Sequence, residues 1–308
     1  MSDDFSTREI ALISAYMDLG AGRRGVDMGP SAIRIAGLGD RLKRLQMPLH
    51  EMGAIYAHER EICQPGDTRL KFLEEVRSVC QQIHQQVNAA LESGWFPLIL
   101  GGDHSIAIGS VSGVAAYFRS RGKDIGLIWV DAHADMNTPE TSPSGNIHGM
   151  PLSVLLGHGD PTLIGLNGNS PSVAPEHVTI LAARDVDSEE KSIVRKTGVR
   201  VFTMSEIDET GIGVCMDEAL KRASNGTGGF HLSFDIDALD PREAPGVGTP
   251  VNGGLTYREA HLLCEKAAQS NALLSMDMVE VNPILDRRNH TAELALHLIE
   301  SALGKTIL

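Results

Sequence analysis

Eight short apolar runs, most of them separated by amphipathic segments, constrain the fold of this 308-residue chain more than any other feature. A short, continuous apolar run is typical of a strand that is buried on both faces, as in a parallel sheet. Strands that alternate with helices predict an α/β fold, with a central, mainly parallel sheet covered by helices on both faces. The runs lie near residues 9–16, 52–56, 96–100, 125–130, 178–182, 199–203, 230–234 and 272–279.

The clearest helical pattern lies in residues 69–94, RLKFLEEVRSVCQQIHQQVNAALESG. Its apolar residues recur at the spacing that places them on one face of a helix, and Gly94 supplies a stop. These residues are Leu70, Leu73, Val76, Val79, Cys80, Ile83, Val87, Ala90 and Leu91. Because a chain of this length can bury a substantial core, we expect residues 1–308 to form a single domain.

The composition suits a globular enzyme, with 42% hydrophobic and 22% charged residues. The formal net charge of −13 disfavours binding to nucleic acid or to an anionic membrane. No run approaches the roughly 18 apolar residues that a membrane span requires. The N-terminal sequence MSDDFSTREI lacks the pattern of a secretory signal, and Cys63, Cys80, Cys215 and Cys264 form no CxxC pair. We therefore expect a cytoplasmic protein with free thiols.

Six candidate metal ligands follow three of the apolar runs. They are His104 in LILGGDH, Asp131, His133 and Asp135 in WVDAHAD, and Asp235 and Asp237 in SFDID. The carboxyl ends of parallel strands share one edge of a sheet, where ligands bind. Since Asp is common in turns, DAHAD or DID alone is equally consistent with solvated turn residues. Three strand ends together favour a shared site.

The four carboxylates in this set would repel one another unless cations lay between them. Two divalent ions would neutralise them. Oxygen and imidazole donors without thiolate argue against a structural zinc site and for an ion such as manganese, while zinc, cobalt and nickel remain open. Asp103, next to His104, either orients an imidazole or caps a turn.

Residues 136–149 form a long segment without periodicity directly after DAHAD, and it carries three candidate substrate-binding or catalytic residues. Asn137 and Ser144 are neutral donors that suit an anionic group such as a carboxylate, or else they hydrogen-bond in turns. Histidine ordinarily titrates near neutral pH, which makes His148 a candidate for proton transfer, although a structural histidine fits its position equally well.

Two further strand ends carry acids. In ARDVDSEEK, the carboxylates near Asp187 and Glu190 can bind an ammonium group or complement the dipole at the start of a helix. In LLSMDMVEVNP, Glu280 can bind a cationic group by paired hydrogen bonds, or it is a surface acid at the end of a strand.

Together these segments resemble the ureohydrolases, and the set that includes SGNIHG is similar to the arginases in particular. The resemblance runs from about residue 8 to the C-terminal helix. The segments that carry it are GVDMGPSAIR, GGDHSIAIG, WVDAHADMNTP, SGNIHGMP, ARDVD, SFDIDALDP, GTPVNGGLTYREA and MVEVNP.

This resemblance implies a three-layer α/β/α arginase-like fold, hydrolysis of L-arginine to L-ornithine and urea, two Mn²⁺ ions per chain, and a homo-oligomer, either a trimer or a hexamer. By position, it implies one ion held by His104, Asp131, Asp135 and Asp235, and the other by Asp131, His133, Asp235 and Asp237. For catalysis, it implies that Asp135 receives a proton from the attacking water and that His148 exchanges protons with solvent. For the substrate, it implies that Glu280 positions the guanidinium and that Thr249 lines the pocket. At the other end of the substrate, the implied ligands are Asn137 and Ser144 for the α-carboxylate, and Asp187 and Glu190 for the α-ammonium.

The sequence departs from the family pattern near the implied α-ammonium site. Ala182, Ala183 and Arg184 stand where the family usually has Gly, a hydrophobic residue and Arg, and Glu189 stands where Gly is frequent. The two alternatives to an arginase are an agmatinase or related ureohydrolase and a non-catalytic metal-binding subunit. Asn137 and Ser144 favour an arginase over an agmatinase, because agmatine has no carboxylate. An intact ligand set with His148 and Glu280 favours an enzyme.

Overall fold

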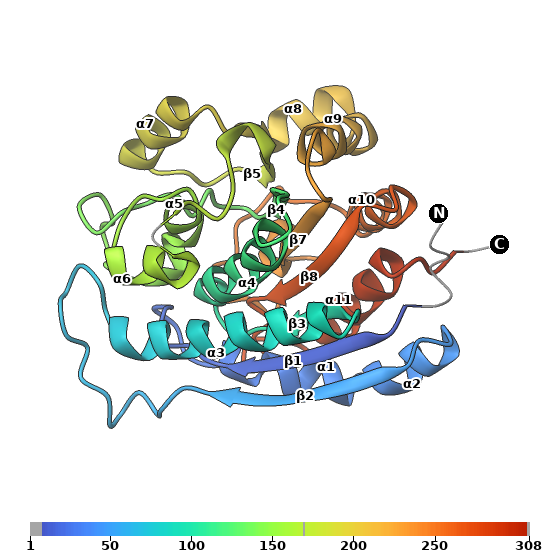
Figure 1. Ribbon diagram of the computed structural model, residues 1–308, viewed down its shortest axis with the longest axis horizontal. Coiled ribbons are helices and arrows are strands. Elements are labelled where there is room, and N and C mark those ends of the chain that lie inside the picture. The colour runs from blue at the N-terminus through green and yellow to red at the C-terminus, as the bar shows by residue number, and fades with distance from the viewer. Residues whose placement is uncertain (1–7, 169, 307–308) are drawn as a thin grey trace.

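A single sheet of eight parallel strands forms the centre of the computed structural model, which describes residues 8–168 and 170–306 (Figure 1). The strand order is β2-β1-β3-β8-β7-β4-β5-β6. The strands are β1 (Ile10–Tyr16), β2 (Leu49–Tyr56), β3 (Phe96–Leu100), β4 (Gly126–Val130), β5 (Val178–Ala183), β6 (Arg200–Thr203), β7 (Phe230–Asp235) and β8 (Leu273–Val279). Each of the eight apolar runs is a strand, which confirms the predicted α/β sheet.

Helices cover both faces of the sheet. They are α1 (Gly29–Ile35), α2 (Leu38–Arg44), α3 (Leu73–Glu92), α4 (Ala107–Arg119), α5 (Pro151–Leu155), α6 (Pro161–Ile164), α7 (Ser188–Thr197), α8 (Met204–Thr210), α9 (Ile212–Ser224), α10 (Tyr257–Gln269) and α11 (His290–Ala302). Two apolar clusters lie on opposite faces, one contributed by α1, α2 and α8 to α11, the other by α3, α4 and α5. This arrangement confirms three layers.

The burial of each strand follows from its place in the sheet. Strands β3, β4 and β7 lie inside the sheet and are buried along their whole length. Apolar residues occupy both faces of β3 and β4, whereas one face of β7 carries the buried polar residues His231 and Ser233, which hydrogen-bond to β8. Strands β2 and β6 form the edges and are partly exposed. None of the helices in residues 8–168 and 170–306 is long and apolar enough to cross a membrane.

The order of the strands positions the candidate site. Strands β3 and β4 follow one another in the sequence, but β8 and β7 lie between them in the sheet. In open parallel sheets, ligands bind beyond the carboxyl ends of the strands, where the strand order changes direction. His104, Asp131, Asp235 and Glu280 follow or end these four strands. The fold therefore brings residues from distant parts of the sequence to one edge.

Helices α3 and α4 pack closely because glycines of α4 face the backbone of α3. A Cβ atom on Gly109 would lie 2.4 Å from the carbonyl oxygen of Cys80, and one on Gly113 would lie 2.9 Å from that of His84. No side chain fits at such distances unless the helices separate.

We expect Gly109→Ala to lower the free energy of unfolding by about 1–3 kcal/mol, because the added methyl group would push the two backbones apart. Gly39→Ala in α2 is the matched control, since no atom lies within 4 Å of the position that its methyl group would take. It should be neutral or raise stability by up to about 1 kcal/mol through its higher helix propensity. Chemical denaturation measures both, and equal stability of the Gly109 variant and the parent would contradict the packing argument.

Candidate active site

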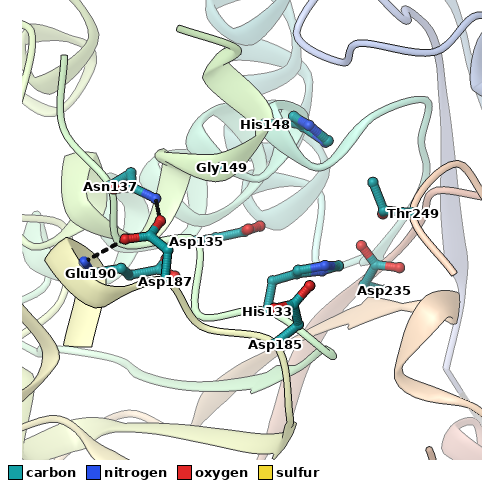
Figure 2. A pocket seen from close by; sticks show the side chains of 10 residues that line it. All are labelled: His133, Asp135, Asn137, His148, Gly149, Asp185, Asp187, Glu190, Asp235 and Thr249. Carbon is teal, nitrogen blue, oxygen red and sulfur yellow. Dashed lines mark hydrogen bonds between the residues drawn. The ribbon is translucent and has the colours of Figure 1, made fainter. Parts of the chain in front are cut away.

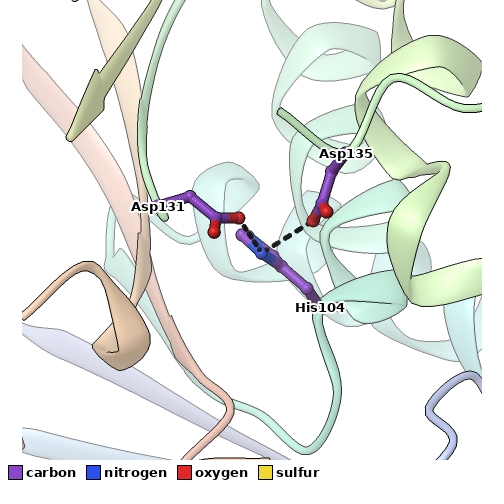
Figure 3. A group of neighbouring side chains, drawn as sticks. All are labelled: His104, Asp131 and Asp135. Atoms are coloured by element: carbon purple, nitrogen blue, oxygen red, sulfur yellow. Dashed lines mark ion pairs between the residues drawn. The ribbon is translucent and has the colours of Figure 1, made fainter. Parts of the chain in front are cut away.

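Two overlapping groups of side chains could each hold a metal ion. In each group, the ligand atoms lie within 4.8 Å of one another. The first consists of His104, Asp131 and Asp135 (Figure 3), and the second of Asp131, His133 and Asp237. Asp131 belongs to both groups. The carboxylate of Asp235 also approaches the first group, with Oδ2 lying 3.3 Å from His104 Nδ1. The structure thus brings all six predicted ligands together.

In the first group, the ring of His104 faces three carboxylates. Its buried Nδ1 lies 3.0 Å from Asp131, 3.1 Å from Asp135 and 3.3 Å from Asp235, yet it makes no well-oriented hydrogen bond. The opposite nitrogen, Nε2, lies 2.9 Å from Ser233 Oγ, and the ring stacks on Trp129. The imidazole is therefore fixed with an unpaired nitrogen atom directed at converging oxygens, as expected of a metal ligand.

In the second group, Asp131 and Asp237 approach the imidazole of His133. Its Nδ1 lies 3.2 Å from Asp131 Oδ1 and 3.2 Å from Asp237 Oδ2. Both carboxylates are also held by other donors. Trp129 Nε1 donates to Asp131 Oδ2 at 3.0 Å, and Thr249 Oγ1 donates to Asp237 Oδ2 at 2.8 Å. These bonds fix the orientations of both carboxylates, so that an oxygen of Asp131 and an oxygen of Asp237 both lie beside His133 Nδ1.

The electrostatics of this cluster favour a cation. Burial, together with the charge of Asp131, raises the pKa of Asp135 to about 7, and burial beside Asp237 and Asp131 raises the pKa of Asp235 well above its usual value. Such carboxylates resist ionisation unless positive charge lies among them. With oxygen and imidazole donors and no thiolate, the residues fit divalent metal ions.

The turns that carry these ligands have unusual backbone conformations. Asp135 and Glu280 have φ angles of 50° and 64°, in the left-handed region that side chains other than glycine seldom adopt. Ala182, at φ 76°, interrupts the register between β5 and β6. This conformation favours glycine, so the alanine there introduces local strain.

Asp103 caps a turn and accepts a hydrogen bond from the loop that contains Gly20. Its carboxylate accepts from Ser105 N at 3.1 Å, at the start of a short 3-10 helix, His104–Ile106, and from Gly20 N at 2.8 Å. Of the two roles predicted for Asp103, the described contacts correspond to turn capping.

His148, which is partly exposed to the pocket, pairs with the buried Glu280 beside the ligands. His148 Nδ1 lies 3.1 Å from Glu280 Oε1, and this oxygen also accepts from His104 N at 2.9 Å. Burial lowers the pKa of His148, but the Glu280 carboxylate outweighs it and raises the pKa to about 9. Glu280 Oε2 is buried and has no hydrogen-bond partner among residues 8–168 and 170–306. An unpaired carboxylate oxygen of this kind is suited to a cationic group of a ligand.

A pocket of about 170 Å³ opens onto the cluster (Figure 2). It is lined by His133, Asp135, Asn137, His148, Gly149, Asp185, Asp187, Glu190, Asp235 and Thr249. Eight of these ten are among the predicted site residues. The sequence indicated no role for Gly149, and it marked Asp185 only as one of the acids in ARDVDSEEK that could bind an ammonium group or complement a helix dipole.

The side of the pocket away from Glu280 is a hydrogen-bonded group of acids and an amide. Asn137 Nδ2 donates to Asp187 Oδ2 at 2.8 Å, while Asn137 Oδ1 accepts from Thr141 at 2.9 Å. Asp187 also caps α7 by accepting from Glu190 N (Figure 2). Glu190 Oε1 accepts from Met136 N at 2.8 Å, and burial raises the pKa of Glu190 to about 8. Thr141, a member of this group, was missed from the sequence because nothing in its local pattern distinguishes it from a turn residue.

Ser144 and Glu280 are the two predicted substrate-binding residues that do not line the pocket. Ser144 is exposed on the loop, where its Oγ accepts from Asn146 N at 3.2 Å. Glu280 is buried in contact with His148 and with the backbone of His104, and it is not among the residues that line the pocket.

Comparison with known proteins places this site in a family. The family model described as Arginase family matches residues 8–304. An arginase from Bacillus caldovelox is 47% identical over 302 residues, which cover 98% of this chain and 100% of the other. Its native structure at pH 5.6 superposes with a TM-score of 0.93. An arginase from Entamoeba histolytica, solved with L-ornithine, is 29% identical, with a TM-score of 0.89 over 97% of this chain and 99% of the other.

Proposed function

Because the chain belongs to the arginase family, we propose that it hydrolyses L-arginine to L-ornithine and urea with two manganese ions. The observation that carries this proposal is the convergence of four carboxylates and two imidazoles at the floor of a pocket. The family assignment supports a hydrolase that acts on arginine, and the donor set supports a metal-dependent one. The choice of manganese and the number of ions are parts of the proposal.

The ligands proposed for the two ions are the two groups together with Asp235, which the resemblance to the family assigns to both ions. His104, Asp131, Asp135 and Asp235 would hold one ion, and Asp131, His133, Asp235 and Asp237 the other. When bound, the ions would neutralise the carboxylates and lower the pKa of a water molecule, so that a nucleophile is available near neutral pH.

The substrate would lie along the pocket with its guanidinium toward the buried end. Glu280 Oε2, which is buried and unpaired, would accept hydrogen bonds from the guanidinium. At the opposite side, Asp187 and Glu190 would bind the α-ammonium group, and Asn137 and Ser144 the α-carboxylate. Thr249 also lines the pocket. The opposed charges would hold arginine in one orientation.

Hydrolysis adds water across the bond between the guanidinium carbon and the side-chain nitrogen of arginine. Asp135 would take a proton from the attacking water as the new C–O bond forms. A proton must then reach the departing nitrogen, which becomes the side-chain amine of ornithine. His148, paired with Glu280 at 3.1 Å, would exchange protons between the site and solvent.

Urea release tests the proposal directly. After loading with manganese, the protein should convert L-arginine to equal amounts of urea and ornithine. A non-catalytic metal-binding subunit would release no urea above the metal-free control, and that outcome would refute the proposed activity.

We expect His148→Ala to retain both metal ions while turnover falls by about a hundredfold, at the lower end of the usual contribution of a general acid–base group, because Asp135 remains. His158→Ala is the matched control, since His158 is exposed and does not line the pocket. Steady-state rates and metal analysis give the result. Loss of one ion from the His148 variant, or turnover equal to that of the parent, would exclude the proton-transfer role.

A further inference from the structure

Arg184, the first residue after β5, donates hydrogen bonds only to backbone carbonyl groups. Within residues 8–168 and 170–306, its guanidinium forms no ion pair with a carboxylate. Its bonds reach Asp237 O at 2.7 Å, Val251 O at 2.7 and 3.2 Å, Ala238 O at 3.0 Å, Leu239 O at 3.1 Å and Ala182 O at 3.3 Å. A charged group that is partly buried against carbonyl groups alone is uncommon, because arginine usually pairs with an acid when it leaves water.

These carbonyl groups belong to the turns that surround the second group of ligands. Asp237 is itself in that group, and Ala238 and Leu239 follow it. Val251 lies two residues beyond Thr249, whose hydroxyl donates to Asp237 Oδ2 at 2.8 Å. The side chain of Arg184 therefore ties the turn that carries Asp237 to the segment that orients the Asp237 carboxylate.

The backbone of Arg184 is connected to the same centre. Its N–H donates at 2.8 Å to the carbonyl oxygen of Ala132, which stands between Asp131 and His133. In turn, Ala132 N donates to Asp237 Oδ1 at 3.2 Å. One residue thus links the turns after β4, β5 and β7. None of its described hydrogen bonds reaches His104 or Asp135, which belong to the first group.

The surroundings are shaped for a guanidinium. A Cβ atom on Gly254 would lie 2.6 Å from Arg184 Nη2 and 2.6 Å from Ala238 O, so the space above the guanidinium admits only glycine. The planar group offers five N–H donors in fixed directions, whereas the ammonium of lysine offers three on a flexible stem. Lysine could not reach all of these carbonyl groups at once.

We propose that Arg184 is a positioning residue for the ion held by Asp131, His133 and Asp237, and that it sets the affinity of this ion without touching ion or substrate. The inference rests on the proposed binding of two ions. Residues that orient metal ligands typically change affinity by about 10–100-fold when they are replaced. Since the hydrogen bonds of Arg184 reach the turns around the second group but neither His104 nor Asp135, its replacement should weaken one ion selectively.

The test is a stepwise manganese titration of the metal-free protein. The electron paramagnetic resonance signal of free Mn²⁺ gives the concentration of unbound ion at each step. For Arg184→Gln we expect one ion to bind within about threefold of the parent affinity and the other to bind about 10–100-fold more weakly. For Arg184→Lys, the affinity of the weaker ion should lie between that of Arg184→Gln and that of the parent. If the glutamine variant does not fold, the lysine variant provides the test. Arg200→Gln in β6 is the matched control, because Arg200 pairs with Glu206 and Glu218 instead.

The variant His133→Asn shows which of the two groups holds the weakened ion, because it removes a ligand from the second group alone. The double variant, Arg184→Gln with His133→Asn, should bind its remaining ion as tightly as His133→Asn does. Parent-like affinity for both ions in folded Arg184 variants would overturn the inference, and so would equal weakening of both ions. A parent protein that binds only one ion would instead refute the proposed binuclear site.

Discussion

Asp131→Ala is expected to lose both metal ions and all measurable arginine hydrolysis, whereas His104→Ala should lose mainly one ion. The reason is the shared position of Asp131. Its Oδ2 lies 3.0 Å from His104 Nδ1, and its Oδ1 lies 3.2 Å from His133 Nδ1, so its two oxygens serve different groups. His104 belongs to the first group only. Without ions, the pocket has no means of generating a nucleophile at neutral pH.

The comparison requires metal analysis after desalting, together with urea release from arginine. Asp160→Ala is the control, because Asp160 caps α6 by accepting from Thr162 N and Leu163 N and belongs to neither group. It should retain the ion content and activity of the parent. If Asp131→Ala retained one tightly bound ion, Asp131 would not bridge two sites.

The strands could be predicted because burial on both faces of a parallel sheet favours apolar residues, although β7 and β8 also carry buried polar residues such as His231 and Asp277. Strand β2 was predicted only in part, because the apolar run near 52–56 does not reach its first residue, Leu49. As an edge strand that is largely exposed, β2 needs fewer apolar residues, and its first half has no signal in the sequence.

The metal cluster could be predicted because each ligand ends a strand or follows a strand within a few residues, and parallel strands end at one edge. The contacts that hold the cluster were not predictable in this way. Asn137 pairs with Asp187 across 50 positions in the sequence, and Asp103 accepts from Gly20 across 83. Such contacts depend on the path of the loops, which hydrophobic periodicity does not encode. The same limit applies to Arg184, whose partners are backbone atoms that any residue could supply.

Arginine is expected to exceed agmatine in catalytic efficiency by about 10²- to 10⁴-fold, because agmatine keeps the terminal amine but lacks the carboxylate. Two hydrogen bonds to a charged group, each contributing about 1.5–3 kcal/mol, give this range. The structure argues against a larger ratio. Ser144 is exposed, and Asn137 is already bonded to Asp187 and Thr141, so neither is left unsatisfied when the carboxylate is absent.

Asn137→Ala should reduce this discrimination, since it removes a donor that only arginine uses. We expect the efficiency with arginine to fall by about tenfold to a hundredfold, as one charge-assisted hydrogen bond would give, while the efficiency with agmatine changes little. Asn146→Ala on the same loop is the control, because Asn146 does not line the pocket and its side chain faces Lys71. Equal efficiencies of the parent with both substrates would favour an agmatinase-like specificity. Equal losses with both substrates in the Asn137 variant would instead assign Asn137 to the support of Asp187, because the ammonium group that Asp187 is proposed to bind is common to both molecules.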